Sequence, residues 1–392
     1  MTTITKKGEP TLNGAPIPVG AGDNFYVFYS FNFALGNYIG ITSYAGGAWT
    51  KNTLVGNQYS GSAALVSNAP APIANTKIRA VQVGAVTCLV YQSGASQLTI
   101  ITETGPNTWE LRTNCTPGGN INNFCLYTDT GNALYLLTHE GNTLYTQSLN
   151  GATLVNRRNI NGQGGLVPNA HTPLDDTQLA AGFWNDYPHF IYASSQGIVD
   201  AYEGSTDNWT ITFVEANAAA PLGIELFDYN NGAFETVCML LTGSDGSIKL
   251  LQFYNGYASP WQNLGGSLPT LPTAASAASI GVNKFGAFAI YRDSSGNLQM
   301  LFNILPNTSW FYVQATGSPQ ALDGNAPAAV SKPIVGIYKN LGFHACYASS
   351  SHEVHDLYWF GIWNDASLYP TAPSLNENIF DTASIKDKTM ME

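Results

Sequence analysis

Short apolar runs alternate with small polar clusters along most of the chain. The runs are five to nine residues long and rich in Val, Ile, Tyr, Phe and Thr, and Gly, Asn, Asp and Ser separate them. In residues 278–316 four runs follow one another: ASIGVNKF, AFAIYRD, NLQMLFNIL and SWFYVQA. Such runs predict β-strands, and Gly or Asn between them suits tight hairpins. No helical periodicity persists, so the pattern predicts an all-β protein.

The tryptophans mark a repeat of about fifty residues. Six of the eight stand at or near the start of a fourth apolar run: Trp49, Trp109, Trp209, Trp261, Trp310 and Trp363. The long gap between residues 109 and 209 holds two periods, because residues 125–158 show the same pattern without a tryptophan. Four-stranded units of this length are typical of propellers. We therefore predict a seven-bladed β-propeller of four-stranded antiparallel blades, or a six-bladed one if the first copy is incomplete.

The repeat places a single propeller domain at residues 1–378. Its blades are expected at residues 15–56, 78–114, 122–158, 178–215, 223–264, 278–316 and 333–370. Residues 379–392 are expected to form a C-terminal tail, or a strand that closes the ring against the first blade.

Long segments rich in Pro, Ala and Gly connect the blades, such as residues 57–75. In a propeller these linkers share a face with the turns between second and third strands, and loops on such a face often carry binding sites. The candidate chemistry on this face is a group of His and Arg residues: His139, Arg157, Arg158, His171, Arg292, His352 and His355. Trp184 is expected near the opposite face. His189 and His344 occupy strand positions, where hydrogen-bonded core histidines are the ordinary interpretation.

Charged residues make up only 10% of the chain, and the formal net charge is −11. Arg157 and Arg158 form the only basic pair of note, so nucleic acid is excluded as a partner. No stretch approaches the ~20 apolar residues of a membrane helix, so no membrane span is expected. Glycosylation sequons at Asn114, Asn208 and Asn307 suit a secreted glycoprotein whose leader was removed. A cytoplasmic location and a homo-oligomer both stay open.

The five cysteines leave the redox compartment open. Cys115 and Cys125 are near enough in sequence to be bridged in an oxidising compartment. Cys88, Cys238 and Cys346 lie within apolar runs and are expected to be buried free thiols.

The segment SHEVHD, at residues 351–356, does not have the pattern of a zinc site. His352 and His355 are three residues apart in an expected turn, and no third ligand is nearby in sequence. No dinucleotide fingerprint, P-loop or nucleophile elbow occurs either. The sequence therefore implies no metal and no cofactor.

The repeated second strands resemble those of fungal fucose-specific lectins. In that family the strand reads like RVYYQ, the third strand bears Glu, and the fourth opens with Trp. The corresponding tyrosines here are Tyr29, Tyr91, Tyr192, Tyr291 and Tyr347. The family's sugar site also needs an Arg three residues earlier, as a charged donor to the sugar oxygens. No copy keeps it, because these positions hold Tyr26, Cys88, Leu134, His189, Cys238, Phe288 and His344.

A lectin-like propeller that lacks its sugar sites is similar to the fungal hetero-Diels-Alderases of tropolone-sesquiterpenoid biosynthesis. The resemblance implies a cofactor-independent pericyclase of secondary metabolism that adds a tropolone ortho-quinone methide to a humulene-type sesquiterpene. Such a protein holds both partners in near-attack geometry and activates the tropolone oxygen with a donor. On this hypothesis the catalytic residues are His139, Arg292, His352 and His355. The substrate-binding residues are Arg157, Arg158, His171, Trp184, His189 and His344.

The alternative hypothesis is a fungal carbohydrate-binding lectin, secreted or cytosolic, with altered sugar specificity. A lectin keeps several equivalent sites between blades, whereas an enzyme needs one deep pocket. The expected partner is accordingly a small apolar or aromatic substrate, or a glycan. An interaction propeller without a small ligand is a third interpretation.

Overall fold

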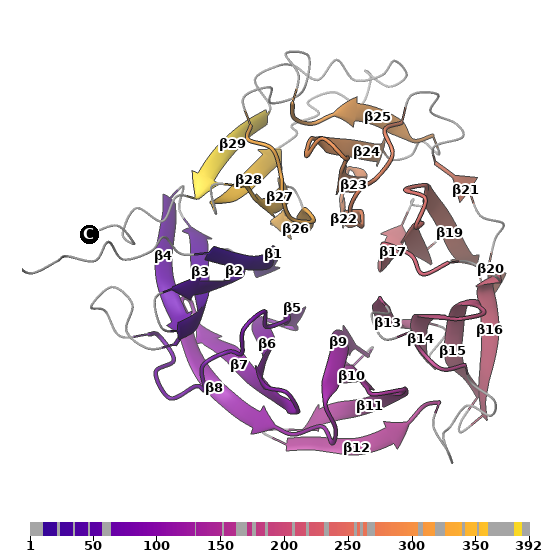
Figure 1. The fold of residues 1–392 in the computed structure, drawn as a ribbon, viewed down its shortest axis with the longest axis horizontal. Coiled ribbons are helices and arrows are strands. Elements are labelled where there is room, and N and C mark those ends of the chain that lie inside the picture. The colour runs from indigo at the N-terminus through magenta and orange to yellow at the C-terminus, as the bar shows by residue number, and fades with distance from the viewer. Residues whose placement is uncertain are drawn as a thin grey trace, which may run out of the picture.

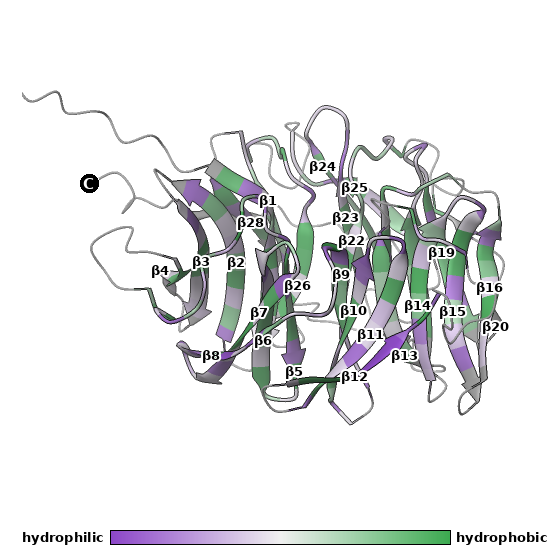
Figure 2. Cartoon of the chain, turned by 60° about the horizontal axis from the view of Figure 1, so that its bottom comes forward, coloured by the Kyte–Doolittle hydropathy of each residue, from purple (hydrophilic) through white to green (hydrophobic). Residues whose placement is uncertain are grey.

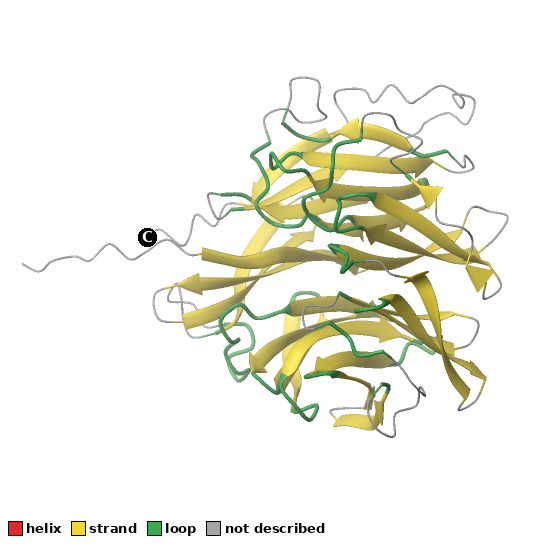
Figure 3. Cartoon of the chain, turned by 45° about the vertical axis from the view of Figure 1, so that its right-hand side comes forward, coloured by secondary structure: helices red, strands yellow, loops and turns green. Residues whose placement is uncertain are grey.

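The computed structural model confirms an all-β chain folded as a seven-bladed propeller (Figure 1). It describes residues 11–21, 24–33, 36–45, 48–56, 64–129, 131–150, 153–161, 171–174, 178–184, 187–205, 208–216, 219–230, 235–254, 257–258, 262–264, 271–304, 309–317, 326–338, 342–350, 353–359 and 380–385. These residues form strands, turns and loops (Figure 3). In the portion of the chain that the structure describes, we find no helix that could span a lipid bilayer.

Each blade is an antiparallel sheet built from consecutive strands. Blade 1 contains β1 (Thr11–Ala21), β2 (Asn24–Phe33), β3 (Gly36–Ala45) and β4 (Ala48–Val55). Blade 2 contains β5 (Ile78–Val83), β6 (Val86–Gly94), β7 (Gln97–Gly105) and β8 (Thr108–Cys115). Blade 3 contains β9 (Ile121–Thr128), β10 (Leu134–Glu140), β11 (Thr143–Asn150) and β12 (Thr153–Asn159). Blade 4 contains β13 (Leu179–Trp184), β14 (Tyr187–Ser194), β15 (Gly197–Ser205) and β16 (Asn208–Ala216).

Blades 5 to 7 follow the same plan with differences at the rim. Blade 5 contains β17 (Gly223–Asn230), β18 (Glu235–Thr242) and β19 (Ile248–Tyr254), and two short strands, β20 (Tyr257–Ala258) and β21 (Gln262–Asn263), both pair with β19. Blade 6 contains β22 (Ser279–Asn283), β23 (Gly286–Arg292), β24 (Leu298–Ile304) and β25 (Phe311–Gln314). Blade 7 contains β26 (Ile334–Tyr338), β27 (Gly342–Ala348), β28 (Val354–Trp359) and β29 (Phe380–Ile385).

The middle strands are buried and mainly apolar because both of their faces are covered by neighbouring blades. Every residue of β24 and of β27 is buried. The outer strand β12 has partly exposed and exposed residues throughout. Figure 2 shows hydrophobic segments along the blades in view and a hydrophilic stretch near β12. The core of the protein is therefore a set of apolar layers between blades.

The ring closes by packing of blade 1 against blade 7, whose inner strands β1, β26 and β27 are in contact. The outer strand of blade 7 is β29, which pairs with β28. Residues 380–385 thus form a strand of the last blade, and of the two expectations for this segment the strand agrees with the structure better than the tail does. Trp363, expected to open this outer strand, lies outside the described residues.

The repeated tyrosines of the second strands fasten the linkers between blades. In three of them the phenol group donates to a backbone carbonyl of the preceding linker, and each bond satisfies a polar group at the edge of the core. The oxygen–oxygen distances are 2.6 Å from Tyr91 to Pro70, 3.0 Å from Tyr192 to His171 and 2.7 Å from Tyr291 to Pro272. The resemblance in these strands therefore has a structural basis.

All five cysteines are free and buried. Cys88, Cys238 and Cys346 are buried within strands, as their apolar surroundings predicted. Cys115 and Cys125 are not bridged in the structure, and burial raises the pKa of each thiol to about 12. Each thiol therefore stays protonated and inert in the folded protein.

Candidate functional site

A pocket of about 640 Å³ lies between blades 3 and 4. Blade 3 contributes Tyr127, Tyr135 and Arg158, among others, and blade 4 contributes Tyr187, Glu203 and Trp209, among others. The pocket thus joins residues from two blades that meet face to face. Aromatic rings and charged groups share its walls.

The aromatic wall is held rigidly by the core beneath it. The rings of Tyr127 and Tyr135 stack at a centroid distance of 5.0 Å. The indole of Trp209 stacks on Phe190 at 5.5 Å and is 5% exposed. The hydroxyl of Tyr127 is 2.7 Å from the hydroxyl of Thr146. Burial raises the pKa of Tyr127 and of Tyr135, so these two phenols remain protonated near neutral pH.

A β-bulge in blade 3 places the two arginines. The register of β11 and β12 shifts between Thr146 and Ser148, so that two residues of β12 face one residue of β11. Asn156, one of the extra pair, has a φ of 55°, a conformation that Asn tolerates. Just beyond the bulge, the guanidinium of Arg158 lies 5.8 Å from the ring centroid of Trp209. Arg158 therefore adds a charged donor to the aromatic wall.

Arg157 belongs to a separate network at the edge of the pocket. Its Nη2 donates to Oε2 of Glu140 at 2.8 Å, and the backbone N–H of Gly119 donates to the same oxygen at 2.6 Å. The guanidinium also lies 3.5 Å from the ring centroid of Tyr145. These contacts hold the guanidinium of Arg157 in place, so we assign Arg157 to the wall of the pocket.

The pocket lies toward the face opposite the long linkers. Phe183, Tyr187 and Trp209 all line it, and they stand at strand ends next to the turns between β13 and β14 and between β15 and β16. Because strands alternate in direction, these turns are on the other side of the disc from the blade-to-blade linkers. This pocket therefore lies on the face opposite the one where the sequence analysis expected binding groups to gather.

The four residues expected to be catalytic are not brought together. His139 is buried in blade 3, and His355 is buried in blade 7, with its Nε2 3.1 Å from Oγ of Ser349. Arg292 of blade 6 donates to the carbonyl of Ala275 at 3.3 Å. His352 lies outside the described residues.

Of the residues expected to bind substrate, Arg157 and Arg158 line the pocket, whereas His171, His189 and His344 are not among its described lining residues. The ring of His171 contacts Phe213 at a centroid distance of 4.8 Å. Trp184 ends β13, and its side chain is outside the described part of the structure. His189 and His344 are buried at other blade interfaces.

His189 and His344 form matching buried pairs with aspartates. The Nδ1 of His189 is 2.9 Å from Oδ2 of Asp200, and the Nδ1 of His344 is 2.8 Å from Oδ2 of Asp356. The first pair faces blade 5 and the second faces blade 1, where His344 stacks on Phe25 at 4.2 Å. Burial raises the pKa of Asp200, while the contact with His189 lowers it. In each pair one imidazole nitrogen and one carboxylate oxygen satisfy each other inside the core.

The strand pairing also corrects one assignment at the position of the missing arginine. His189 lies opposite Tyr202 in blade 4, and the matching row of blade 3 contains Tyr135 opposite Ser148. Leu134, one residue earlier, packs toward blade 2. A register error of one residue reverses the face of a strand, which is why the sequence missed this pocket residue.

Glu203 also escaped the sequence analysis, although a signal for it exists. Glu203 lies six residues before Trp209, and Glu103 lies six residues before Trp109. In both blades the two residues are cross-strand partners. A search for carboxylates at fixed distances from the repeat tryptophans finds both.

No family model matches this sequence, and no curated protein sequence matches it. Several solved structures are similar to this chain. The BP39L lectin from Burkholderia pseudomallei is similar at 10% identity, with a TM-score of 0.60 over 89% of this chain and 96% of that one. AofleA from Arthrobotrys oligospora is 12% identical, with a TM-score of 0.51 over 79% of this chain and 90% of that one.

Aleuria aurantia lectin, in a complex with alpha-methyl-L-fucoside, is 14% identical, with a TM-score of 0.50 over 77% of this chain and 94% of that one. A structure of that lectin is described as a six-bladed propeller, whereas the present chain has seven blades. Identities this low show a shared fold. The chain is a propeller with a lectin-like fold.

Proposed function

We propose that this protein binds a carbohydrate in the pocket between blades 3 and 4. The observation that supports the proposal is the convergence of Trp209, Arg158 and Glu203 on the walls of one pocket. A sugar ring has apolar C–H faces and a polar rim. Aromatic rings pack against such faces, a guanidinium donates to hydroxyl and ring oxygens, and a carboxylate accepts from hydroxyls.

The other interfaces support a lectin with few sites over one with a site in every blade. Between blades 6 and 7 the ring of Phe288 packs on Phe343 at 5.5 Å. Between blades 7 and 1 His344 packs on Phe25, and between blades 1 and 2 Tyr26 packs on Trp109 at 5.2 Å. Protein side chains thus fill three positions that a ligand would need.

The hetero-Diels-Alderase hypothesis stays a prediction without a structural observation in its favour. Its described catalytic candidates, His139, Arg292 and His355, belong to blades 3, 6 and 7. Each is held by its own local surroundings. A tropolone that binds in this pocket and forms cycloadduct faster than the uncatalysed reaction would favour the enzyme over the lectin.

A glycan array followed by calorimetric titration of the best-bound glycan tests the proposal. Arg158→Met and Glu203→Gln are each expected to weaken binding about tenfold, because each removes a charge-assisted hydrogen bond. Glu215→Gln is the matched control, because Glu215 is in the same blade as Glu203 but pairs with Lys249 of blade 5 outside the pocket. The proposal fails if no glycan binds, or if both pocket variants bind as the wild type does.

A further inference from the structure

Blades 2 and 4 carry the same pair of residues at the same place. Glu103 in β7 lies opposite Trp109 in β8, and Glu203 in β15 lies opposite Trp209 in β16. A register shift follows each pair before the turn. Trp109 packs with residues of blade 1, and Trp209 packs with residues of blade 3. Each blade therefore presents one carboxylate and one indole to the blade before it.

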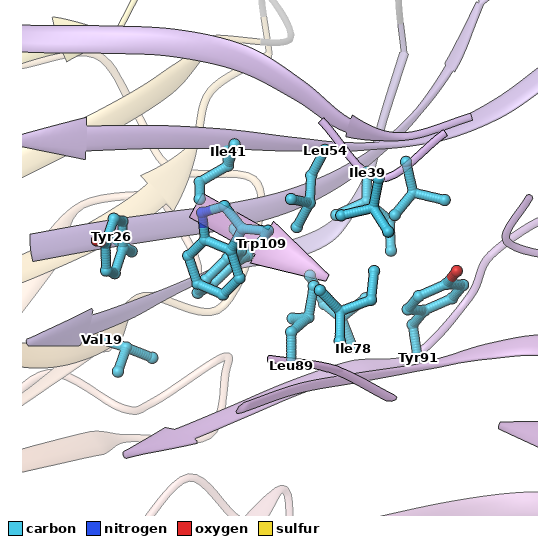
Figure 4. Packing of buried hydrophobic residues seen from close by; sticks show 13 residues of the cluster. Val19, Tyr26, Ile39, Ile41, Leu54, Ile78, Leu89, Tyr91 and Trp109 are labelled. Atoms are coloured by element: carbon cyan, nitrogen blue, oxygen red, sulfur yellow. The ribbon is translucent and has the colours of Figure 1, made fainter. Parts of the chain in front are cut away.

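Between blades 1 and 2, a side chain of the protein occupies the space in front of this pair. The hydroxyl of Tyr26 donates to Oε1 of Glu103 and accepts from the backbone N–H of Asn107 at 3.3 Å. Its ring meets Trp109 edge to face, at a centroid distance of 5.2 Å and an angle of 78°. Tyr26 is fully buried and lies beside Trp109 in Figure 4. Burial and the bond to Glu103 raise the pKa of Tyr26, so the phenol remains the donor.

The residue in blade 3 that corresponds to Tyr26 is also a tyrosine. Tyr26 in β2 pairs with Ser43 in β3, and Tyr135 in β10 pairs with Ser148 in β11. Both tyrosines face the next blade, where Tyr26 packs in one apolar cluster with Trp109 and Tyr135 packs against the cluster that contains Trp209. Both interfaces therefore have a tyrosine at the equivalent position of the second strand, and it faces a glutamate and a tryptophan of the next blade.

Tyr135 differs from Tyr26 in where its hydroxyl goes. It donates to Oδ2 of Asp129 at 3.1 Å, within its own blade, and its ring stacks on Tyr127. This orientation leaves the pocket of about 640 Å³ beside Glu203 and Trp209. The place that Tyr26 fills in one interface is thus part of the pocket in the other.

We infer that Tyr26 is a built-in ligand, and that the interface between blades 1 and 2 is a closed copy of the pocket between blades 3 and 4. Both positions take a six-membered ring with a hydroxyl group that donates to the glutamate while the ring packs against the tryptophan. Tyr26 supplies this ring in the closed copy, and an external molecule supplies it in the pocket. The inference rests on the proposed function for the place of binding and adds the ligand group that Glu203 recognises.

The closed copy has the features of a site that accepts an external ring once Tyr26 is removed. Oε2 of Glu103 is buried and has no hydrogen-bond partner in the structure, although the residue is only 8% exposed. Glu103 also lines a groove of about 970 Å³ on blade 2, together with Asn24 of blade 1. A carboxylate left in such a place favours a hydroxyl donor strongly over an apolar group.

The first test uses p-cresol, which is the side chain of tyrosine, and toluene, which lacks the hydroxyl. Tyr26→Ala is expected to bind one more equivalent of p-cresol than the wild type, about tenfold more tightly than toluene, in titrations followed by calorimetry. The matched control is Glu103→Gln in the Tyr26→Ala background, which should reduce this preference. If Tyr26→Ala gains no p-cresol site, or binds toluene equally well, the closed copy is refuted.

A second test uses the wild-type protein, so that it does not depend on folding of the variant. Saturating p-cresol should shift the indole N–H signal of Trp209 in NMR spectra and compete with the bound glycan, and Glu203→Gln should weaken p-cresol about tenfold. A glycan that binds without competition from p-cresol, and with no effect of Glu203→Gln, overturns this inference and leaves carbohydrate binding intact. A p-cresol site in Tyr26→Ala without any bound glycan supports the inference and refutes the proposed function.

Discussion

The interface between blades 3 and 4 is open, whereas the interface between blades 7 and 1 is closed. In both, the same position of the second strand faces the next blade. In the first, Tyr135 borders a pocket. In the second, His344 fills the row, bonds to Asp356 and stacks on Phe25 at 4.2 Å. Phe25 is the residue before Tyr26 in β2 of blade 1. Pro188, the residue before His189 in β14, occupies the equivalent position of blade 4 and lines the pocket. The size of this residue in the following blade therefore helps to decide whether an interface is open.

Phe25→Ala tests the closed side of this comparison and has the largest expected effect. Phe25 is fully buried at the interface between blades 7 and 1, and its loss leaves a cavity beside His344. We expect a fall of about 3–5 kcal/mol in the free energy of unfolding, measured with urea. Phe183→Ala at the pocket is the control and should lose much less, because Phe183 is partly exposed. Equal losses would contradict the comparison.

Pro188→Phe tests the open side by placing a large ring where blade 1 has one. The ring is expected to fill the pocket and to weaken glycan binding by more than about tenfold, which is 1.4 kcal/mol. Titration with the best-bound glycan measures the loss, and the urea midpoint shows whether the blade still folds. Pro188→Ala, which adds no volume, serves as the control and should keep the affinity. Unchanged binding in Pro188→Phe would show that residue size at this place is irrelevant.

Tyr192→Phe tests the interface between blades 3 and 4 at its linker side, away from the pocket. The hydroxyl of Tyr192 holds the linker carbonyl of His171 at 3.0 Å. Removing one buried hydrogen bond is expected to cost about 1 kcal/mol in urea unfolding and to leave glycan affinity unchanged. A change in affinity without a change in stability would mean that the linker, and not the opposite face, carries the ligand.

The smallest effect is a change in the pH dependence of stability at Asp200. Burial raises the pKa of this carboxyl in the folded state, so the folded protein binds its proton more tightly than the unfolded chain does. This contribution to stability is present at low pH and is lost as pH rises through the raised pKa. As pH falls toward the ordinary pKa of an aspartate, about 4, the wild type should therefore gain stability relative to Asp200→Asn. A constant difference in urea unfolding energies would contradict this sign.

The fold was predictable because its signals are local. Alternating apolar runs, Gly and Asn turns and tryptophans at regular distances indicated seven four-stranded units, and all seven sheets are present. The tail was misjudged, because the sequence does not show that residues 380–385 pair with β28. Arg157 and Arg158 were selected as rare charges, and both line the pocket. The pocket lies on the face opposite the expected one, because the choice of the linker face came from the general placement of binding loops in propellers.

Local pattern specified the strand content, the number of blades and the buried tyrosines of the second strands, because hydrogen-bonded strands and hairpin turns depend on residues close in sequence. The identity of the open interface depends on how two side chains from different blades share one volume. Tyr26 meets Glu103, 77 positions away, and fills the space, while Tyr135 turns to Asp129 in its own blade and leaves it open. Equivalent tyrosines thus adopt different orientations because each must pack closely against side chains of another blade. The periodicity of the sequence does not show which side chains those are.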